Sequence, residues 1–209
     1  AAVAVGCRPH PLGALSRRPR TVFAGKLTMH AQAFTLFDTA IGRCAIAWGD
    51  GGIVGIQLPE PQPAATRARM LRRFPGAGPG VPPADVQRVI DDIVALLRGD
   101  PRGFATARLD LRDVPEFDRA VYTAARTIAP GETITYGELA ARIGDPDAAR
   151  AVGQSLGRNP FPIVIPCHRV LAAGGKAGGF SASGGAATKL RLLAIEGASP
   201  NRTLPLLLE

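Results

Sequence analysis

Apolar side chains recur along residues 33–58 in short runs that are typical of β-strands. The first run begins with Phe34, Leu36 and Phe37, and two further runs cover residues 44–48 and 53–58. Residues 49–52 (Gly-Asp-Gly-Gly) separate the last two runs. Because glycine accepts the backbone conformations of tight turns, this spacing predicts a hairpin within a three-stranded meander.

Beyond residue 60, the pattern of apolar and polar residues changes to one that is typical of helices. Residues 61–74 predict a short helix with an arginine-rich solvent side, and residues 75–83, with four prolines and three glycines, predict a loop. Apolar side chains at i, i+3, i+4 and i+7 predict an amphipathic helix over residues 84–98. Gly99-Asp100-Pro101 ends this helix, and residues 107–111 predict another strand. The first half of the chain is therefore a small α/β unit.

Helical patterns dominate beyond Pro115. One helix is expected to bury a face that ends before Pro130-Gly131 and is made of Phe117, Ala120, Val121, Ala124 and Ile128. Thr135, followed three residues later by Glu138, predicts a capping box at the start of a helix over residues 136–143. After the turn 144–146, Asp147 is expected to cap a second helix that reaches about residue 157. This order predicts a helix-turn-helix.

The second of these helices has two different sides. Ala148, Val152 and Leu156 form its core stripe, whereas Arg150, Gly153 and Gly157 lie on the other side. A glycine inside a helix costs about 1 kcal/mol relative to alanine, so two of them indicate a close backbone partner, which is either another part of the protein or DNA. An extended apolar run over residues 161–165, a glycine-rich loop over 174–185 and a last helix over 185–197 are expected to follow.

Composition and charge narrow the class of protein. The chain has 209 residues and a mass of 21.7 kDa, and 46% of the residues are hydrophobic, which suffices for a packed core. Three cysteines favour a reducing compartment over a disulfide-bonded secreted domain, and no run of 18 apolar residues is present. The net charge of +8 is concentrated in residues 1–29, which have five basic and no acidic side chains. The rest of the chain has no strong charge pattern for nucleic acid.

We therefore expect four segments: a disordered basic arm over residues 1–29, an N-terminal domain over 30–112, a C-terminal domain over 113–200 and a tail over 201–209. The candidate nucleophile lies in the third, in the run Ile165-Pro166-Cys167-His168-Arg169-Val170. A cysteine attacks as the thiolate, and a neighbouring imidazole promotes that form. Taken alone, however, a cysteine in an apolar run is more typical of a buried small hydrophobic residue.

The surrounding motifs decide between these interpretations. The region from Pro115 to Gly197 resembles the active-site region of the O6-alkylguanine-DNA alkyltransferases, the methylated-DNA–protein-cysteine methyltransferases. The matching motifs are Thr-Tyr-Gly-Glu-Leu-Ala at 135–140, Ala-Ala-Arg-Ala-Val-Gly at 148–153, Arg-Asn-Pro-Phe-Pro-Ile-Val-Ile-Pro-Cys-His-Arg-Val at 158–170, Gly-Gly-Phe-Ser at 178–181, and Lys189 with Ala-Ile-Glu-Gly at 194–197. The resemblance implies an α+β fold, with a ribonuclease H-like N-terminal domain and a winged-helix-like C-terminal domain.

The same resemblance implies DNA repair by irreversible transfer of an alkyl group from O6-alkylguanine, and also from O4-alkylthymine, to Cys167 in a single turnover. His168 then acts as a base through a water molecule, and Glu196 orients and charges it. Asn159 supports the active-site turn, and Tyr136 donates toward the purine. A water bridge also agrees with the predicted extended backbone, because neighbouring side chains in such a segment point to opposite faces.

DNA is the partner that the resemblance implies: double-stranded, carrying O6-alkylguanine, bound through its minor groove, with the target base flipped out. The residues expected at DNA are Arg150, Tyr136, Gly153, Ser155 and Gly157. Those expected to line the substrate pocket are Leu156, Val170, Gly178, Phe180 and Ser181. No organic cofactor, no metal and no membrane are implied, and we expect a monomer in the bacterial-type cytoplasm, at the nucleoid when bound to DNA.

Some features depart from the family pattern. Phe180 replaces a tyrosine of some relatives, and extra loop residues near Ala182-Ser183 leave the pocket width open. Cys7, His10, His30 and Cys44 have the residue types of a zinc site, but Gly49 and Val54 occupy the positions aligned with the family's zinc ligands. Three alternative functions stay open at this point: a non-catalytic lesion-binding protein, a cysteine hydrolase and a helix-turn-helix regulator.

Overall fold

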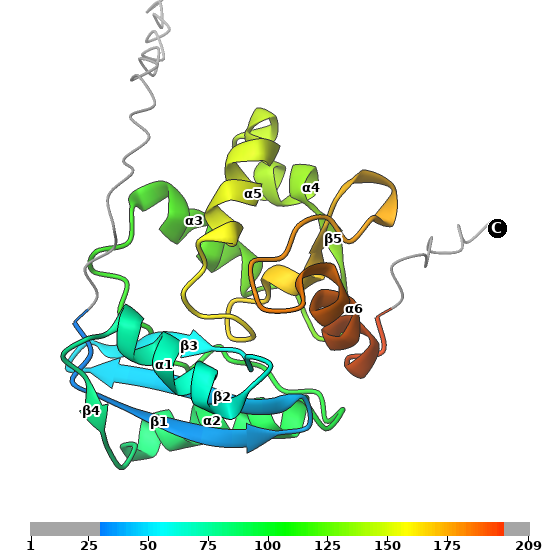
Figure 1. Cartoon of the computed structure of the whole chain (residues 1–209). Coiled ribbons are helices and arrows are strands. Elements are labelled where there is room, and N and C mark those ends of the chain that lie inside the picture. The colour runs from blue at the N-terminus through cyan, green and yellow to red at the C-terminus, as the bar shows by residue number, and fades with distance from the viewer. Residues whose placement is uncertain (1–29, 199–209) are drawn as a thin grey trace, which may run out of the picture.

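A four-stranded sheet forms the N-terminal half of the chain. The structure, a computed structural model, describes residues 30–198 (Figure 1), so the predicted arm, the predicted tail, Cys7 and His10 lie outside the described residues. Strands β1 (Ala33–Thr39), β2 (Gly42–Gly49) and β3 (Gly52–Gln57) form an antiparallel meander. The predicted meander and its hairpin after Gly49 are therefore confirmed.

The edges of the sheet differ from the prediction. Residues 78–79, expected in a loop, form the short strand β4 (Gly78–Pro79), which pairs in parallel with β1 and gives the strand order β3-β2-β1-β4. A proline fits here because an edge strand does not need every N–H. The strand expected over residues 107–111 is also wrong, since only a single bridge joins Leu109 to Ile53. Two backbone hydrogen bonds hold that bridge, from Ile53 N to the Arg108 carbonyl and from Asp110 N to the Ile53 carbonyl.

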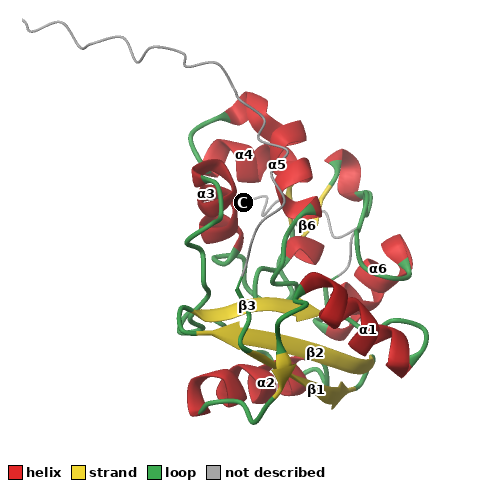
Figure 2. Ribbon diagram, turned by 60° about the vertical axis from the view of Figure 1, so that its left-hand side comes forward, coloured by secondary structure: helices red, strands yellow, loops and turns green. Residues whose placement is uncertain are grey.

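Two helices cover opposite faces of the sheet, as Figures 1 and 2 show. Helix α1 (Pro63–Arg73) packs Met70 against Phe34, Ala45, Ala47 and Val54. Helix α2 (Ala84–Leu96) packs on the other face, where Cys44, Ile46 and Trp48 point. This division follows from the alternation of side chains along β2. Both helices were predicted, α2 from its apolar periodicity and α1 as a short helix with an arginine-rich solvent side.

The C-terminal half is mainly helical and lies beside β3 (Figure 2). Its helices are α3 (Glu116–Ala125), α4 (Tyr136–Arg142), α5 (Ala149–Gly157) and α6 (Gly185–Ile195). Two short strands of this half, β5 (Ile134–Thr135) and β6 (Val170–Leu171), pair with each other in parallel. The predicted α+β class is thus confirmed. Among the described residues, no helix has both the length and the apolar character needed to cross a membrane.

Helix α3 buries most of its predicted face, since Val121 is buried and Phe117 and Ala124 pack against the core, but this face also includes residues that were not predicted. Ala120 is exposed, and the helix ends at Ala125, before Ile128. Asp118 and Tyr122 are buried as well, because both have partners on or next to α5. Arg158 donates to Asp118 at 3.1 Å, and the Tyr122 hydroxyl donates to the Ser155 carbonyl at 3.2 Å. Polar partners from a distant segment, which apolar periodicity does not record, set the rotation of this helix.

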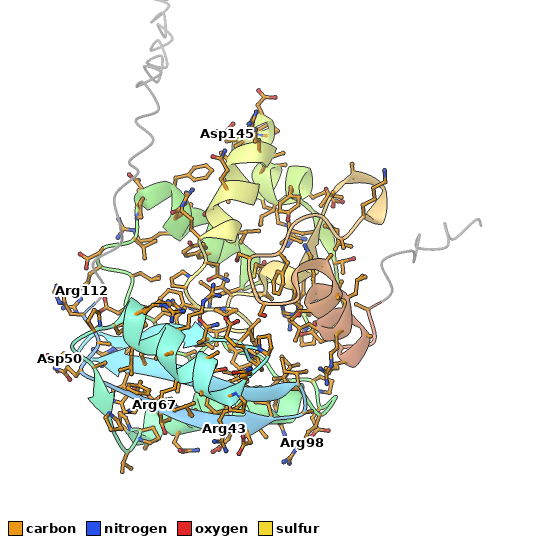
Figure 3. The ribbon with its side chains drawn as sticks, in the orientation of Figure 1. Arg43, Asp50, Arg67, Arg98, Arg112 and Asp145 are labelled. Atoms are coloured by element: carbon orange, nitrogen blue, oxygen red, sulfur yellow. The ribbon has the colours of Figure 1, made fainter. Side chains whose placement is uncertain are left out.

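The helix-turn-helix is built from α4 and α5. The predicted capping box is present, with Glu138 N donating to the Thr135 hydroxyl and Thr135 N donating to the Glu138 carboxylate. Asp145 lies at the tip of the connecting turn (Figure 3). The second helix does not start with an Asp147 cap, because a 3-10 turn over Pro146–Ala148 comes first and α5 then begins at Ala149 without a side-chain cap.

We expect the Thr135→Ala substitution to reduce the free energy of unfolding by about 1 kcal/mol, since it removes the hydroxyl that accepts from Glu138 N. Urea denaturation followed by circular dichroism measures this. Thr123→Ala is the matched control, because Thr123 is exposed on α3, and its effect should stay within about 0.5 kcal/mol. Equal effects of the two substitutions would contradict a stabilising role for the cap.

Candidate active site

A tight turn precedes the candidate nucleophile. The run over residues 161–165 is not extended as predicted: Ile165 N donates to the Phe161 carbonyl at 2.8 Å, and Ile163 has a φ of 76°. The Asn159 side chain holds both ends of the turn. Its Nδ2 donates to the Ile165 carbonyl at 2.9 Å, and its Oδ1 accepts from Phe161 N at 2.9 Å. Asn159 thus makes the contacts that its predicted structural role requires.

Cys167, His168 and Arg169 form a buried 3-10 turn. The expectation of an extended backbone here was wrong, because Cys167 N donates to the Ile165 carbonyl and Arg169 N donates to the Pro166 carbonyl. Figure 1 shows this segment next to α6. The two side chains after Cys167 both reach Glu196, the residue that follows α6.

Glu196 has two buried partners. His168 Nε2 lies 2.9 Å from its Oε1, as the resemblance implied. Arg169 binds the same carboxylate with two nitrogens, Nε to Oε2 and Nη2 to Oε1, both at 2.8 Å. The sequence motifs did not predict this role for Arg169. All three side chains are at most 4% exposed, so these are charge-assisted bonds in a region that excludes water.

The electrostatics of this triad favour a neutral imidazole. Burial acts to raise the pKa of Glu196, but hydrogen bonds from His168 and Arg169 outweigh it and lower that pKa to about 2. Burial lowers the pKa of His168 against the opposing effect of Glu196. Because Arg169 already balances the carboxylate, we assign the ring as neutral, with Nε2–H donating to Glu196. His168 Nδ1 is buried and has no partner among the described residues, so its lone pair can accept a proton.

The thiol is protonated at rest and has a nearby cation. Burial raises the pKa of Cys167, while the Asn159 amide and the charge of Lys189 act to lower it. Lys189 Nζ donates to the Val170 carbonyl at 2.6 Å and lies 5.6 Å from the centre of the Tyr136 ring. Burial lowers the pKa of Lys189 to about 8. Lys189 belongs to one of the sequence motifs, but its burial near the thiol was not predicted.

A cavity of about 570 Å³ opens at Cys167. Its lining includes most of the residues predicted for substrate and DNA: Tyr136, Arg150, Gly153, Leu156, Gly157, Phe180 and Ser181. Val170 is not among them, because its side chain is fully buried in the core. Gly178 also lies outside the lining and faces the Tyr136 ring, since a Cβ added there would be 3.5 Å from Cε2.

The predicted DNA-facing side of α5 is partly wrong. Arg150 is exposed, but the Ser155 side chain is fully buried and unsuited to contact DNA. Ser155 lies three residues after Val152, which places both on the inner side of the helix. The two glycines are not required by packing within the protein. A Cβ at Gly153 would make an ordinary 3.7 Å contact with Tyr136, and one at Gly157 would meet nothing within 4 Å.

The described part of the chain contains no group of three His, Cys, Asp or Glu side chains that could hold a metal ion. Cys44 is buried beneath the sheet, where its Sγ lies 3.8 Å from the Thr39 hydroxyl. Burial raises the pKa of this thiol to about 12, so Cys44 has the character of a core residue.

A helix-turn-helix beside a buried cysteine, histidine and glutamate defines a DNA-binding protein with a thiol at its reactive centre. Residues 116–198 match the family model for the DNA binding domain of 6-O-methylguanine DNA methyltransferase. The chain is 54% identical over 162 residues to the methylated-DNA–protein-cysteine methyltransferase of Mycolicibacterium paratuberculosis, covering 76% of this chain and 88% of the relative. It is 36% identical over 154 residues to that of Methanothermobacter thermautotrophicus, covering 74% and 79%.

Solved structures agree with these relatives. The crystal structure of Mycobacterium tuberculosis OGT in complex with DNA has a TM-score of 0.64 at 34% identity, over 79% of this chain and 92% of that one. The O6-methylguanine-DNA methyltransferase of Pyrococcus kodakaraensis has a TM-score of 0.58 at 28% identity, over 79% and 99%. The chain belongs to the methylated-DNA–protein-cysteine methyltransferase family, which repairs DNA by methyl transfer to a cysteine.

We expect the buried triad to make the fold acid-sensitive. The pKa of Glu196 is lower in the folded state, about 2, than the ordinary value of 4.5, so its carboxylate stabilises the fold at pH values above 4.5. This contribution is lost as the pH falls from 4.5 toward about 2. Between these pH values, the free energy of unfolding of the wild type should fall by up to about 3 kcal/mol through this group. A Glu196→Gln/Arg169→Met protein lacks both charges and should not show this part of the decrease. Urea denaturation at several pH values measures the difference. Parallel stability curves would contradict the assignment.

Proposed function

We propose that Cys167 is the residue that accepts the alkyl group from O6-alkylguanine in DNA, once per protein molecule. One observation carries this proposal: Cys167 lies in the same cavity as Tyr136 and Arg150, and it directly precedes the histidine whose buried Nδ1 has no partner within residues 30–198. The described residues contain one other cysteine, Cys44, which is enclosed in the sheet core. The family's reaction needs a cysteine at a DNA-facing cavity, and Cys167 meets this requirement.

The chemistry follows from the charges around the thiol. The sulfur gives its proton to His168 Nδ1 through a water molecule and attacks the alkyl carbon that is bonded to O6. The carbon–oxygen bond breaks, a thioether forms, and guanine leaves after taking up a proton, for which we assign the Tyr136 hydroxyl in the cavity lining as the donor. Lys189 stabilises the thiolate, since its charge lowers the pKa of Cys167. Glu196 fixes the histidine tautomer and stabilises the imidazolium once it forms.

The base must leave the duplex to reach this thiol, because the O6 substituent lies inside the base stack. We assign Arg150, exposed at the edge of the cavity and on α5, to the gap left by the flipped base. The small residues Gly153 and Gly157 leave a smooth surface beside it, which suits a minor groove. Reaction with O4-alkylthymine, action as a monomer, a cytoplasmic location at the nucleoid and a domain boundary near residue 113 are parts of the same proposal.

A non-catalytic lesion-binding protein would share the helix-turn-helix and the cavity, but it has no use for a cysteine with an adjacent base. A regulator would be expected to have a more basic recognition helix, whereas Arg150 is the one charged residue of α5. A hydrolase needs an intermediate that water can cleave, and a thioether resists this. These features favour the alkyl-acceptor function over all three alternatives.

Intact-mass measurement tests the acceptor. After mixing with a duplex that carries one O6-methylguanine, the protein should gain the mass of one methylene on Cys167, and labelled methyl should reach a plateau at about one equivalent. Cys167→Ser should gain nothing, whereas Cys44→Ser should react as the wild type does. Continued turnover, or modification of another residue, would exclude the proposal.

Arg150→Ala should slow repair of duplex DNA much more than reaction with free O6-benzylguanine. Flipping costs a few kcal/mol of unstacking and unpairing, and the free base requires none of it. Single-stranded DNA should fall between the two. Rate constants are compared at one salt concentration, because phosphate contacts depend on salt.

Arg142→Ala is the matched control for this experiment, since Arg142 is exposed on α4 and its side chain reaches Thr127. This variant should not show the difference between duplex and free base. If Arg150→Ala slows all three substrates equally, Arg150 supports the fold or the pocket and has no role in base flipping.

A further inference from the structure

A second cavity meets Cys167 from the side of the N-terminal domain. Its volume is about 200 Å³, and it lies between β3 and α1 on one side and the active-site turn on the other. It shares Gly157, Cys167, Phe180 and Ser181 with the larger cavity, so the thiol lies where the two meet. Its remaining lining residues are Ile56, Gln57, Leu58, Arg69, Arg73, Arg158, Asn159, Pro160, Pro162 and Ala182.

Three arginines line this cavity, and they differ in their partners. Arg69 pairs with Glu60 at 2.7 Å, and Arg158 pairs with Asp118 at 3.1 Å. Arg73 has no carboxylate partner within residues 30–198, and its guanidinium donates to neutral oxygens only. These bonds are Nη1 to the Ile56 carbonyl at 2.9 Å, Nη1 to Gln57 Oε1 at 3.4 Å and Nη2 to the Pro160 carbonyl at 3.3 Å.

Arg73 therefore brings an uncompensated positive charge to the cavity. Burial and the neighbouring Arg69 lower its pKa to about 10, so the group stays charged at neutral pH. The guanidinium also lies over the Phe74 ring, 5.2 Å from its centre, which fixes its position. Its three bonds use three of the five N–H groups of a guanidinium, so two remain for a further acceptor. A cation held in this way matches a carboxylate more closely than a neutral group.

The geometry of the transfer gives the cavity a use. In a displacement at carbon, the sulfur, the carbon and the leaving oxygen lie in line, so any further substituent on that carbon points to the side. With guanine in the larger cavity and the reacting carbon at Cys167, the smaller cavity is the adjoining space into which such a substituent can extend.

We propose that the cavity between the domains is a subsite for O6-alkyl groups that end in a carboxylate, and that Arg73 is the residue that selects them. This inference rests on the proposed function, because it needs Cys167 as the acceptor. The reaction is balanced as before: the sulfur–carbon bond forms, the carbon–O6 bond breaks with its electron pair staying on guanine, the thiol proton goes to His168, and guanine takes up one proton from Tyr136 to leave as the neutral base. The carboxylate stays on the new thioether, beside Arg73.

The test compares paired duplex substrates that differ only in charge. Rate constants are measured for O6-carboxymethylguanine and its neutral carbamoylmethyl analogue, and again for the 2-carboxyethyl group and its amide, with O6-methylguanine as the reference. For each variant, the rate constant of the acid is divided by that of its amide, and this ratio is compared with the wild-type ratio. The comparison cancels the intrinsic difference in reactivity between the two substrates. Arg73→Gln should lower this ratio about tenfold at one or both chain lengths, as expected for loss of a charge-assisted hydrogen bond.

Arg73→Lys retains the charge and should recover part of the ratio. Arg72→Gln is the control, because Arg72 is exposed on the same helix and does not line the cavity, so the ratio should not change. A structural effect of Arg73 through Pro160 would slow acid, amide and methyl substrates alike. Unchanged ratios in Arg73→Gln at both lengths would overturn the subsite. Failure of the wild type on O6-methylguanine would instead overturn the proposed function itself.

Discussion

The buried carboxylate of Glu196 connects the parts of the reactive centre. It follows the last residue of α6 and bonds both His168 and Arg169, which lie in the 3-10 turn that begins with the thiol. A carboxylate at the C-terminal end of a helix is unfavourable to the helix dipole, so this position needs compensation from cations or donors. Arg169 supplies the charge and His168 supplies a hydrogen bond. The orientation of the histidine, and with it the free Nδ1, depends on this arrangement.

Burial determines the resting state of the site. It raises the pKa of the Cys167 thiol and lowers the pKa of His168, so both groups are neutral before substrate arrives. Lys189 is close enough to favour the thiolate, but it is held on the Val170 carbonyl. In the proposed reaction, the proton therefore leaves the thiol only when the substrate fills the cavity.

The two domains meet at the turn that positions the thiol. The Pro160 carbonyl accepts from Ile56 N at 2.8 Å and from Arg73 at 3.3 Å, so β3 and α1 both hold the segment that Asn159 closes. The N-terminal domain therefore does more than cover the DNA-binding domain. It supplies one wall of a cavity at Cys167, and the charge on that wall is what distinguishes it from a simple packing surface.

The amino-acid sequence was sufficient to predict the secondary structure elements that depend on residues close together in the chain. Short apolar runs and the glycine-rich turn at residues 49–52 predicted the meander, apolar periodicity predicted α2, and the Thr135–Glu138 spacing predicted the capping box. The motif resemblance gave the candidate nucleophile and its contact with Glu196. Features that depend on distant partners were visible only in the tertiary structure. These are the burial of Asp118 on α3 beside Arg158, the 3-10 turn at Cys167, the burial of the Ser155 side chain and the binding of Arg169 to Glu196. The tertiary structure also decided that Arg73 turns from the predicted solvent side toward Pro160. A periodic pattern indicates which side of an element is apolar. A buried polar group, however, is stable only where a partner from another segment completes its hydrogen bonds, and only the folded chain shows which residue that partner is.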